Sequence, residues 1–308
     1  MGKIVVFGGS GYLGSAVVRR ALQDGHEAVV VGRSGHGVEN ARAVTWDAKA
    51  LGPWAEELEG AYGVVNLCGS PIFQRWTASS KAAIWSSRVE TTKLIGQAIA
   101  ACKTPPGAWV NASATGGYGD CGTREVSEAS AFSGGFLGEL CQAWEGAVTQ
   151  SETPNTSQCR LRLGIVLGNG CPFGSVLSKL PAIGPLGDGS HYQPWIHADD
   201  VSGLVMLALE QRLPGAMNAT APVPATNDAL MASIRKAMVR LPAPPVPRMV
   251  IRLVCKANGW EEGLLMDSCR AVPQIATSRG YTFAYERVEA AALDAFGQVP
   301  EAWRRQLA

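Results

Sequence analysis

Short apolar runs alternate with longer amphipathic stretches through roughly the first two hundred residues of the chain. Runs such as Val29-Val30-Val31 are continuously apolar, which is typical of parallel strands covered on both faces. The pattern predicts strands at 3–7, 28–31, 43–46, 63–67, 109–112 and 158–166. It predicts helices at 12–23, 81–101, 136–150 and 199–209. This alternation indicates an α/β fold, a doubly wound parallel sheet of the Rossmann type that binds its ligand at the carboxyl ends of the strands.

The amino-acid composition of the chain changes after about Gly168. Segment 168–195 is rich in glycine and proline, and a second proline-rich stretch covers 241–247. Such stretches are typical of loops rather than of sheet elements. We therefore expect two parts. A nucleotide-binding domain takes residues 1–167, with 193–225 returning to it, and a small C-terminal lobe of helices and loops takes 168–192 and 226–308.

The amino-acid composition argues against a nucleic-acid partner and against a membrane-spanning segment. The 308 residues carry a net charge of +1, and 17% of them are charged, so we expect no nucleic-acid partner. No apolar run approaches the roughly 18 residues of a membrane span. Because the first predicted strand begins at Lys3, no targeting segment is expected in the chain as given. These features predict a soluble intracellular protein, of the cytoplasm or of an organelle matrix or stroma.

The metal-binding residue types are scattered. None of the eight cysteines forms a C-x-x-C pair, and the four histidines show no ligand spacing. We expect reduced thiols and no metal site.

The most informative local feature lies between Phe7 and Gly14, which reads Phe-Gly-Gly-Ser-Gly-Tyr-Leu-Gly. A predicted strand precedes this segment and an amphipathic helix follows it. Glycines spaced G-x-x-G-x-x-G allow a tight turn whose backbone amides, with the start of the helix, approach a pyrophosphate. The turn predicts a dinucleotide site, and the residues expected to form it are Gly8, Ser10, Gly11, Tyr12, Leu13 and Gly14.

The second predicted strand ends in Gly32-Arg33-Ser34, where an NAD-preferring site would place a carboxylate. A guanidinium and a hydroxyl bind a 2′-phosphate that a carboxylate would repel, so Arg33 and Ser34 favour NADP(H). The alternative is that Arg33 is a solvated loop residue.

Two later strand ends complete the predicted cofactor site. Asp47 follows the third strand and either accepts a hydrogen bond from the adenine or caps a helix. After the fourth strand, Leu67, Cys68 and Gly69 let the backbone run past the adenosine.

Taken together, these motifs resemble the extended short-chain dehydrogenase/reductase superfamily. In particular, the chain is similar to the atypical, uncharacterised "epimerase family" branch with a distinctive C-terminal domain. The motifs that carry the resemblance are Gly-Gly-Ser-Gly-Tyr-Leu-Gly at 8–14, Thr-Trp-Asp at 45–47, Asn-Leu-Cys-Gly-Ser-Pro-Ile at 66–72, Ser-Arg-Val-Glu-Thr-Thr at 87–92, Ser-Ala-Thr at 113–115, Trp-Glu at 144–145 and Pro-Trp-Ile-His-Ala-Asp-Asp at 194–200.

The resemblance implies a serine at the end of the fifth strand, which is Ser113, and a Tyr-x-x-x-Lys pair on the following helix. The serine is present, but the pair is absent from the whole chain. Where the resemblance places it, the sequence reads Phe136-Leu137-Gly138-Glu139-Leu140. The resemblance also places Arg88 where many relatives carry an asparagine, as a cofactor-site residue or as a partner in a structural salt bridge.

Two interpretations of the missing pair stay open. In the first, the protein is an NADP(H)-dependent oxidoreductase or epimerase acting on a small polar metabolite. Ser113 and Tyr118 then serve as its catalytic residues, with Glu139 and His197 as weaker candidates for the acid or base. Tyr118 could equally anchor its loop, and His197 is expected to be structural, at a helix start capped by Asp199. In the second interpretation, the protein is a non-catalytic NADPH-binding structural or redox-sensing subunit of a larger assembly. By resemblance, a homodimer is also expected.

Overall fold

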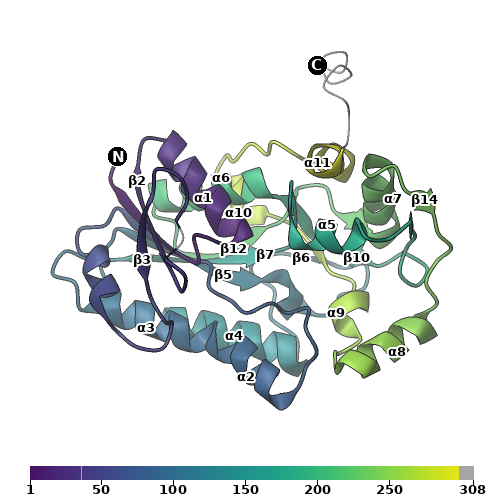
Figure 1. Ribbon diagram of the computed structural model, residues 1–308, viewed down its shortest axis with the longest axis horizontal. Helices are drawn as coiled ribbons and strands as arrows, with labels where there is room; N and C mark the ends of the chain where they lie inside the picture. Colours follow the sequence, from purple (N-terminus) through teal and green to yellow (C-terminus); the bar gives the residue numbers. More distant parts are fainter. Residues whose placement is uncertain (36, 298–308) are drawn as a thin grey trace, which may run out of the picture.

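A computed structural model describes residues 1–35 and 37–297 (Figure 1). Its centre is a seven-stranded sheet with the order β3-β2-β1-β4-β5-β7-β12, in which every neighbouring pair is parallel. The strands are β1 (Lys3–Phe7), β2 (Glu27–Gly32), β3 (Arg42–Thr45), β4 (Gly63–Asn66), β5 (Ala108–Ala114), β7 (Ser157–Leu163) and β12 (Gly215–Ala219). The predicted doubly wound α/β fold is confirmed.

Helices cover both faces of this sheet (Figure 1). On one face lie α1 (Tyr12–Gln23), α6 (Ala198–Glu210) and α10 (Gln274–Ser278); on the other lie α2 (Ala78–Ser86), α3 (Val89–Ala100) and α4 (Gly135–Thr149). Alternate residues of one strand therefore enter different cores. Val6 packs in the core beneath α1 and α6, whereas Val5 and Phe7 pack with Trp54 and Ile95 on the side of α3. Burial on both faces explains why the strands are continuously apolar.

The direction of winding changes at β1. From β1 the chain adds β2 and β3 on one side and then returns to add β4 on the other, so that Phe7 pairs with both Val31 and Asn66. In open parallel sheets the ligand crevice forms at such a switch point, outside the carboxyl ends of the strands. The glycine turn and residues 67–69 both lie there.

Two elements predicted as continuous are divided, so those predictions were wrong. The strand at 158–166 splits at Gly164 into β7 and β8 (Ile165–Leu167), because the chain turns to pair β8 with β11 (Trp195–His197). The helix at 81–101 splits into α2 and α3 at residues 87 and 88. There Ser87 accepts a hydrogen bond from Ser70 N and Arg88 donates one to Ser70 O, so contacts with a distant loop interrupt the helix.

The remaining elements gather at one end of the sheet, on the right of Figure 1. The exception is η1 (Pro53–Leu58), which packs against α3. The others are η2 (Thr115–Tyr118) near the sheet, then β6 (Glu125–Val126), α5 (Pro172–Leu177), β9 (Ala182–Ile183), β10 (Tyr192–Gln193), β13 (Ala225–Thr226), α7 (Asn227–Ala237), β14 (Leu241–Pro242), α8 (Arg248–Asn258), α9 (Gly263–Met266), β15 (Arg270–Ala271) and α11 (Val288–Phe296). A separate core joins α7 and α11 around Leu230, Ile234 and Ala291. The predicted domain division stays a prediction, and its last residues, 298–308, lie outside the described part.

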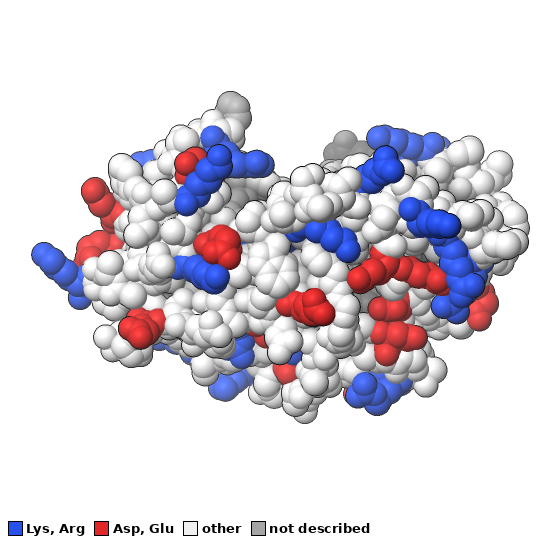
Figure 2. Space-filling model, turned by 90° about the horizontal axis from the view of Figure 1, so that it is seen from below, with Lys and Arg blue, Asp and Glu red and all other residues white. Residues whose placement is uncertain are grey.

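Charges of both signs are interspersed on the face seen in Figure 2. Among the described helices, none has the length and apolarity needed to cross a bilayer.

Candidate cofactor site

The glycine turn has the geometry of an anion site. Gly8 adopts φ +73°, and Gly11 N donates to Gly8 O at 3.0 Å. A Cβ on Gly14 would lie 2.2 Å from Gly8 O, so only glycine fits this position. Gly11 is the N-cap of α1 and brings no side-chain cap, which leaves the first amides of the helix available to a ligand.

The end of β2 adds polar groups beside this turn. The hydroxyl of Ser10 lies 3.6 Å from the position of a Cβ on Gly32, so Ser10 adjoins the segment that carries Arg33 and Ser34. Arg33 and Ser34 are both exposed. Burial raises the pKa of the Cys68 thiol to about 12, and the positive charge of Arg33 acts against this rise. A cation and two hydroxyls thus belong to adjoining segments at the end of β2, where the sequence places the 2′-phosphate.

Asp47 lies in a turn after β3. It is exposed, and its Oδ1 accepts a hydrogen bond from Lys49 N at 2.9 Å. This contact closes a local turn and caps no helix. The adenine contact of Asp47 stays a prediction.

Asn66, at the end of β4, fixes the backbone that runs past the crevice. It is fully buried, and its Nδ2 donates to Asn111 Oδ1 at 2.7 Å and to Thr92 Oγ1 at 3.1 Å. Its Oδ1 accepts from Cys68 N at 3.1 Å. Residues 67–69 are therefore held by a buried amide network. The sequence analysis missed Thr92 and Asn111, although an asparagine within an apolar strand was an available signal.

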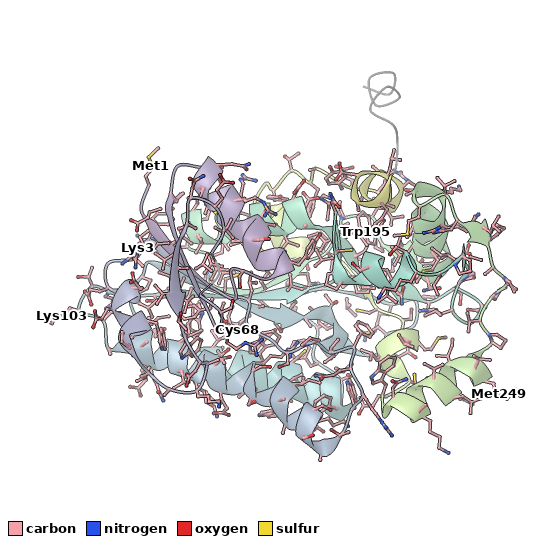
Figure 3. The ribbon with its side chains drawn as sticks, in the orientation of Figure 1. Met1, Lys3, Cys68, Lys103, Trp195 and Met249 are labelled. Carbon is pink, nitrogen blue, oxygen red and sulfur yellow. The ribbon has the colours of Figure 1, made fainter. Side chains whose placement is uncertain are left out.

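The turn and this backbone are in contact. A Cβ on Gly8 would lie 3.1 Å from Leu67 O, and the adjoining Cys68, labelled in Figure 3, is partly buried. The predicted residues of the phosphate turn and the backbone after the fourth strand are thus brought together.

Arg88 lies at the N-cap of α3, beside Gly69. Its Nη1 donates to Ser70 O at 3.0 Å and to Ile84 O at 3.2 Å. Its guanidinium carbon lies 5.3 Å from the centre of the Trp144 ring, and burial lowers its pKa. The salt bridge considered for it does not form with any described carboxylate.

Ser113 and Tyr118 both belong to a buried polar network. Ser113 Oγ donates to Glu145 Oε1 at 2.7 Å, and the same oxygen accepts from Arg162 Nε at 2.7 Å. Arg162 Nη1 donates to Tyr118 Oη at 2.8 Å. All four residues are less than a tenth exposed. Sequence reasoning did not predict the contacts of Glu145 with Ser113 and of Arg162 with Tyr118.

The Tyr118 hydroxyl is enclosed by protein groups. It is 2.7 Å from Asn218 Oδ1, to which it donates, and 3.1 Å from Ser127 O. The residue is 3% exposed, and burial raises the pKa of its phenol to about 12. This environment favours the loop-anchoring role over proton transfer, and the catalytic roles of Ser113 and Tyr118 stay predictions.

The positions of the missing Tyr-x-x-x-Lys pair are filled by apolar packing. The Phe136 ring packs edge-on against Trp76 at 5.0 Å between centres, and Leu140 is 2% exposed in the same cluster. Glu139, on the same helix, is exposed.

His197 has the structural place expected of it, although its predicted cap was wrong. The imidazole is itself the N-cap of α6, since its Nδ1 accepts from Asp199 N at 3.3 Å. The ring also packs on Tyr285, at 4.0 Å between centres.

Comparisons with known proteins agree with this geometry. Residues 4–134 match the model of the NAD dependent epimerase/dehydratase family. The human epimerase family protein SDR39U1 is 32% identical over 301 residues, which cover 94% of this chain and 98% of the relative. The chain belongs to this epimerase family. The epimerase family protein YfhF of Bacillus subtilis is 30% identical, covering 93% and 95% of the two chains. The resemblance to atypical short-chain dehydrogenases/reductases is thus confirmed.

Solved structures of the family share the fold. The human SDR39U1 structure, determined with NADPH, has a TM-score of 0.84 at 29% identity and covers 96% of this chain and 100% of its own. A nucleoside-diphosphate sugar epimerase from Corynebacterium glutamicum has a TM-score of 0.76 at 26% identity, covering 99% of this chain and 60% of its own.

Proposed function

We propose that this epimerase-family protein binds NADP(H) and acts as an atypical oxidoreductase or epimerase on a small polar metabolite. The observation that carries the proposal is the turn at Gly8–Gly14, whose backbone leaves no room for a side chain at Gly14 and presents the first amides of α1. The NADPH in the human relative's structure supports the choice of cofactor.

In this proposal, each part of the crevice has one role. The turn holds the pyrophosphate. The 2′-phosphate is held by Ser10, Arg33 and Ser34, and the adenosine is bordered by residues 67–69. The full set of proposed cofactor-binding residues is Gly8, Ser10, Gly11, Tyr12, Leu13, Gly14, Arg33, Ser34, Asp47, Leu67, Cys68, Gly69 and Arg88. Ser113 would orient the reacting oxygen, and Tyr118 is the nearest phenol for proton transfer.

A specific observation favours a second function, that of a non-catalytic NADPH-binding structural or redox-sensing subunit. Phe136 and Leu140 pack in an apolar cluster where the resemblance to the superfamily places the proton-handling pair, and both Ser113 and Tyr118 are hydrogen-bonded within the protein. Bound NADPH stabilises a fold by mass action even without turnover. Consumption of the bound nicotinamide when a metabolite mixture is added would identify the enzyme. Purification only as a stoichiometric part of a larger complex, with inert cofactor, would identify the subunit.

The cofactor is tested by denaturing the purified protein and identifying released nucleotides by mass spectrometry, and by calorimetric titration with NADPH and NADH. Replacing Arg33 by Asp should weaken NADPH binding at least about tenfold more than NADH binding, because a charge-assisted contact becomes a repulsion. Arg279→Asp is the matched charge control. It ends α10, which packs near β12 at the opposite edge of the sheet from β2. Equal losses for both nucleotides would remove Arg33 from the 2′-phosphate site, and no binding of either would refute the proposed function.

A further inference from the structure

A surface cavity of about 610 Å³ lies at the amino ends of β7 and β12. Its walls are the loop 151–156, which follows α4, the first half of β7, and Pro214 and Gly215 at the start of β12. Since the strands of the sheet run parallel, this edge is opposite the carboxyl ends that border the cofactor crevice. Lys3, the first residue of β1, marks the same edge on the left of Figure 3. The cavity is therefore separate from the site described above.

Arg160 presents a cation to this cavity. Its neighbours on β7, Cys159 and Leu161, belong to the core beneath α1 and α6, so Arg160 lies on the opposite face, which α4 covers. Its Nε lies 3.5 Å from Glu145 Oε2 and makes no hydrogen bond within residues 1–35 and 37–297. The side chain is 19% exposed, which leaves its Nη1 and Nη2 as the donors open to the cavity.

Glu145 neutralises Arg160 only in part. Its Oε1 accepts from Arg162 Nε at 2.7 Å, and its Oε2 accepts from Arg162 Nη2 at 2.9 Å. One carboxylate thus faces two guanidinium groups, and Arg160 is the more distant of the two. Among the described residues that line the cavity, Glu152 is the only acid, and it is exposed and does not pair with Arg160. The wall of the cavity therefore carries a partly buried positive charge that the fold does not balance.

A second polar group at the wall lacks a partner. Thr156 is 5% exposed, and its Oγ1 is buried with no hydrogen bond to any residue that the structure describes. The neighbouring polar side chains are used locally, since Gln158 Nε2 donates to Thr153 Oγ1 at 2.8 Å. Ser157 Oγ likewise donates to Arg212 O at 2.7 Å. An unpaired hydroxyl and an unbalanced guanidinium are both unfavourable inside a protein, and a negatively charged acceptor in the cavity would relieve both.

We propose that this cavity binds a small oxyanion, the carboxylate or phosphate group of a metabolite, through Nη1 and Nη2 of Arg160 with the Thr156 hydroxyl beside them. Charge-assisted hydrogen bonds to a guanidinium fork suit both of these groups. Pro154 and Pro214 line the same cavity and provide apolar contacts for the rest of the ligand. The site goes beyond the proposed function, since none of these residues belongs to the cofactor crevice.

Through Glu145, this cavity is connected to the candidate catalytic residues. The carboxylate that faces Arg160 also accepts from Ser113 Oγ at 2.7 Å, and its partner Arg162 donates to Tyr118 Oη at 2.8 Å. An anion on Arg160 reduces the attraction of that guanidinium for Glu145 and so changes the balance of the network. The ligand is therefore an effector, and its binding and that of the cofactor must affect each other reciprocally.

The test uses the full chain saturated with NADPH, so that the phosphate turn is occupied. Calorimetry measures the binding of inorganic phosphate and of malonate, and hydrogen exchange at residues 151–158 locates the bound ion. Arg160→Gln should weaken the bound probe at least about tenfold, because it removes the charged donors. Arg212→Gln is the matched control, since this exposed arginine adjoins Ser157 through its backbone and does not line the cavity.

Thr156→Val tests the site without removing a charge, and it decides the matter if Arg160→Gln does not fold. Loss of the orphaned hydroxyl should weaken the probe about three- to tenfold. The same change should leave the melting temperature unchanged or raise it, because no hydrogen bond within the protein is lost. A residue with only a structural role would not show this opposition between binding and stability.

The outcomes are distinct. Binding of phosphate alone identifies a phosphorylated ligand, and binding of malonate alone identifies a carboxylate ligand. No binding of either probe to the wild type, or equal weakening in Arg160→Gln and Arg212→Gln, would overturn the site. Saturating probe should change the affinity for NADPH at least about fivefold in the wild type and not in Arg160→Gln, and an unchanged affinity would overturn the effector role. If the protein binds no NADPH, the proposed function fails, while titrations of the free protein still test Arg160.

Discussion

Glu145 on α4 and Arg162 on β7 form a buried, two-pronged ion pair, with Nε–Oε1 at 2.7 Å and Nη2–Oε2 at 2.9 Å. Around this pair the chain assembles Ser113, Tyr118 and, through Tyr118, Asn218 of β12. Three neighbouring strands and one covering helix are thereby connected through side chains. The pair holds the end of β5 and the loop after it, beside the proposed cofactor crevice.

Removing one member of this pair should be strongly destabilising. Arg162→Leu leaves a buried Glu145 whose remaining cation, Arg160, is 3.5 Å away, so we expect a loss of about 3–5 kcal/mol in the free energy of unfolding. The double variant Glu145→Leu with Arg162→Leu should lose less than Arg162→Leu alone. Arg160→Leu is the matched control, with a smaller effect expected because this arginine is partly exposed. Urea unfolding of the wild type and the three variants measures these losses, and a smaller loss in Arg162→Leu than in Arg160→Leu would contradict the structural role.

Tyr118→Phe should lower stability by about 1–2 kcal/mol, because Asn218 Oδ1 loses its donor. It should leave the affinity for NADPH unchanged. Fluorescence titration with NADPH and urea unfolding are the measurements. A variant of near-normal stability that has lost an NADPH-dependent activity would instead establish Tyr118 as the catalytic phenol.

The pH dependence of Tyr118 gives a separate test. The folded pKa of about 12 exceeds the unfolded value of about 10, so the unfolded chain ionises first as the pH rises. Wild-type protein should therefore lose stability relative to Tyr118→Phe between about pH 10 and 12, by up to about 2.7 kcal/mol. Urea unfolding of both proteins across this range measures the difference. A constant difference would show that the phenol is not buried as described.

Gly14→Ala should abolish or weaken NADPH binding at least about tenfold, because its Cβ would meet Gly8 O at 2.2 Å and displace the turn. The control is Gly146→Ala inside α4, where the nearest atom to the new Cβ is Gln150 Nε2 at 3.8 Å. Alanine there should raise the free energy of unfolding by up to about 1 kcal/mol and leave binding unchanged. Calorimetry and urea unfolding report both quantities, and normal NADPH affinity in Gly14→Ala would contradict the role of the turn.

The sequence by itself determined the sheet and the turn at its switch point. Continuous apolar runs located six of the seven strands of the sheet because both sheet faces are covered, and β1 and α1 have the predicted bounds. The edge strand β12 was not predicted. The glycine spacing located the phosphate turn because its geometry depends on residues only three apart. The absence of the Tyr-x-x-x-Lys pair was likewise evident from the sequence alone.

Only the tertiary structure decided which polar residues meet. Ser113 and Glu145 are 32 positions apart, and Tyr118 and Asn218 are 100 apart, so no local pattern encodes either contact. The break between α2 and α3 depends on Ser70, a residue of a distant loop, and it is this break that places Arg88 beside Gly69. The periodicity of apolar residues along a segment indicates which of its faces is buried. The hydrogen-bond partner of a buried polar group depends instead on how the segments pack together.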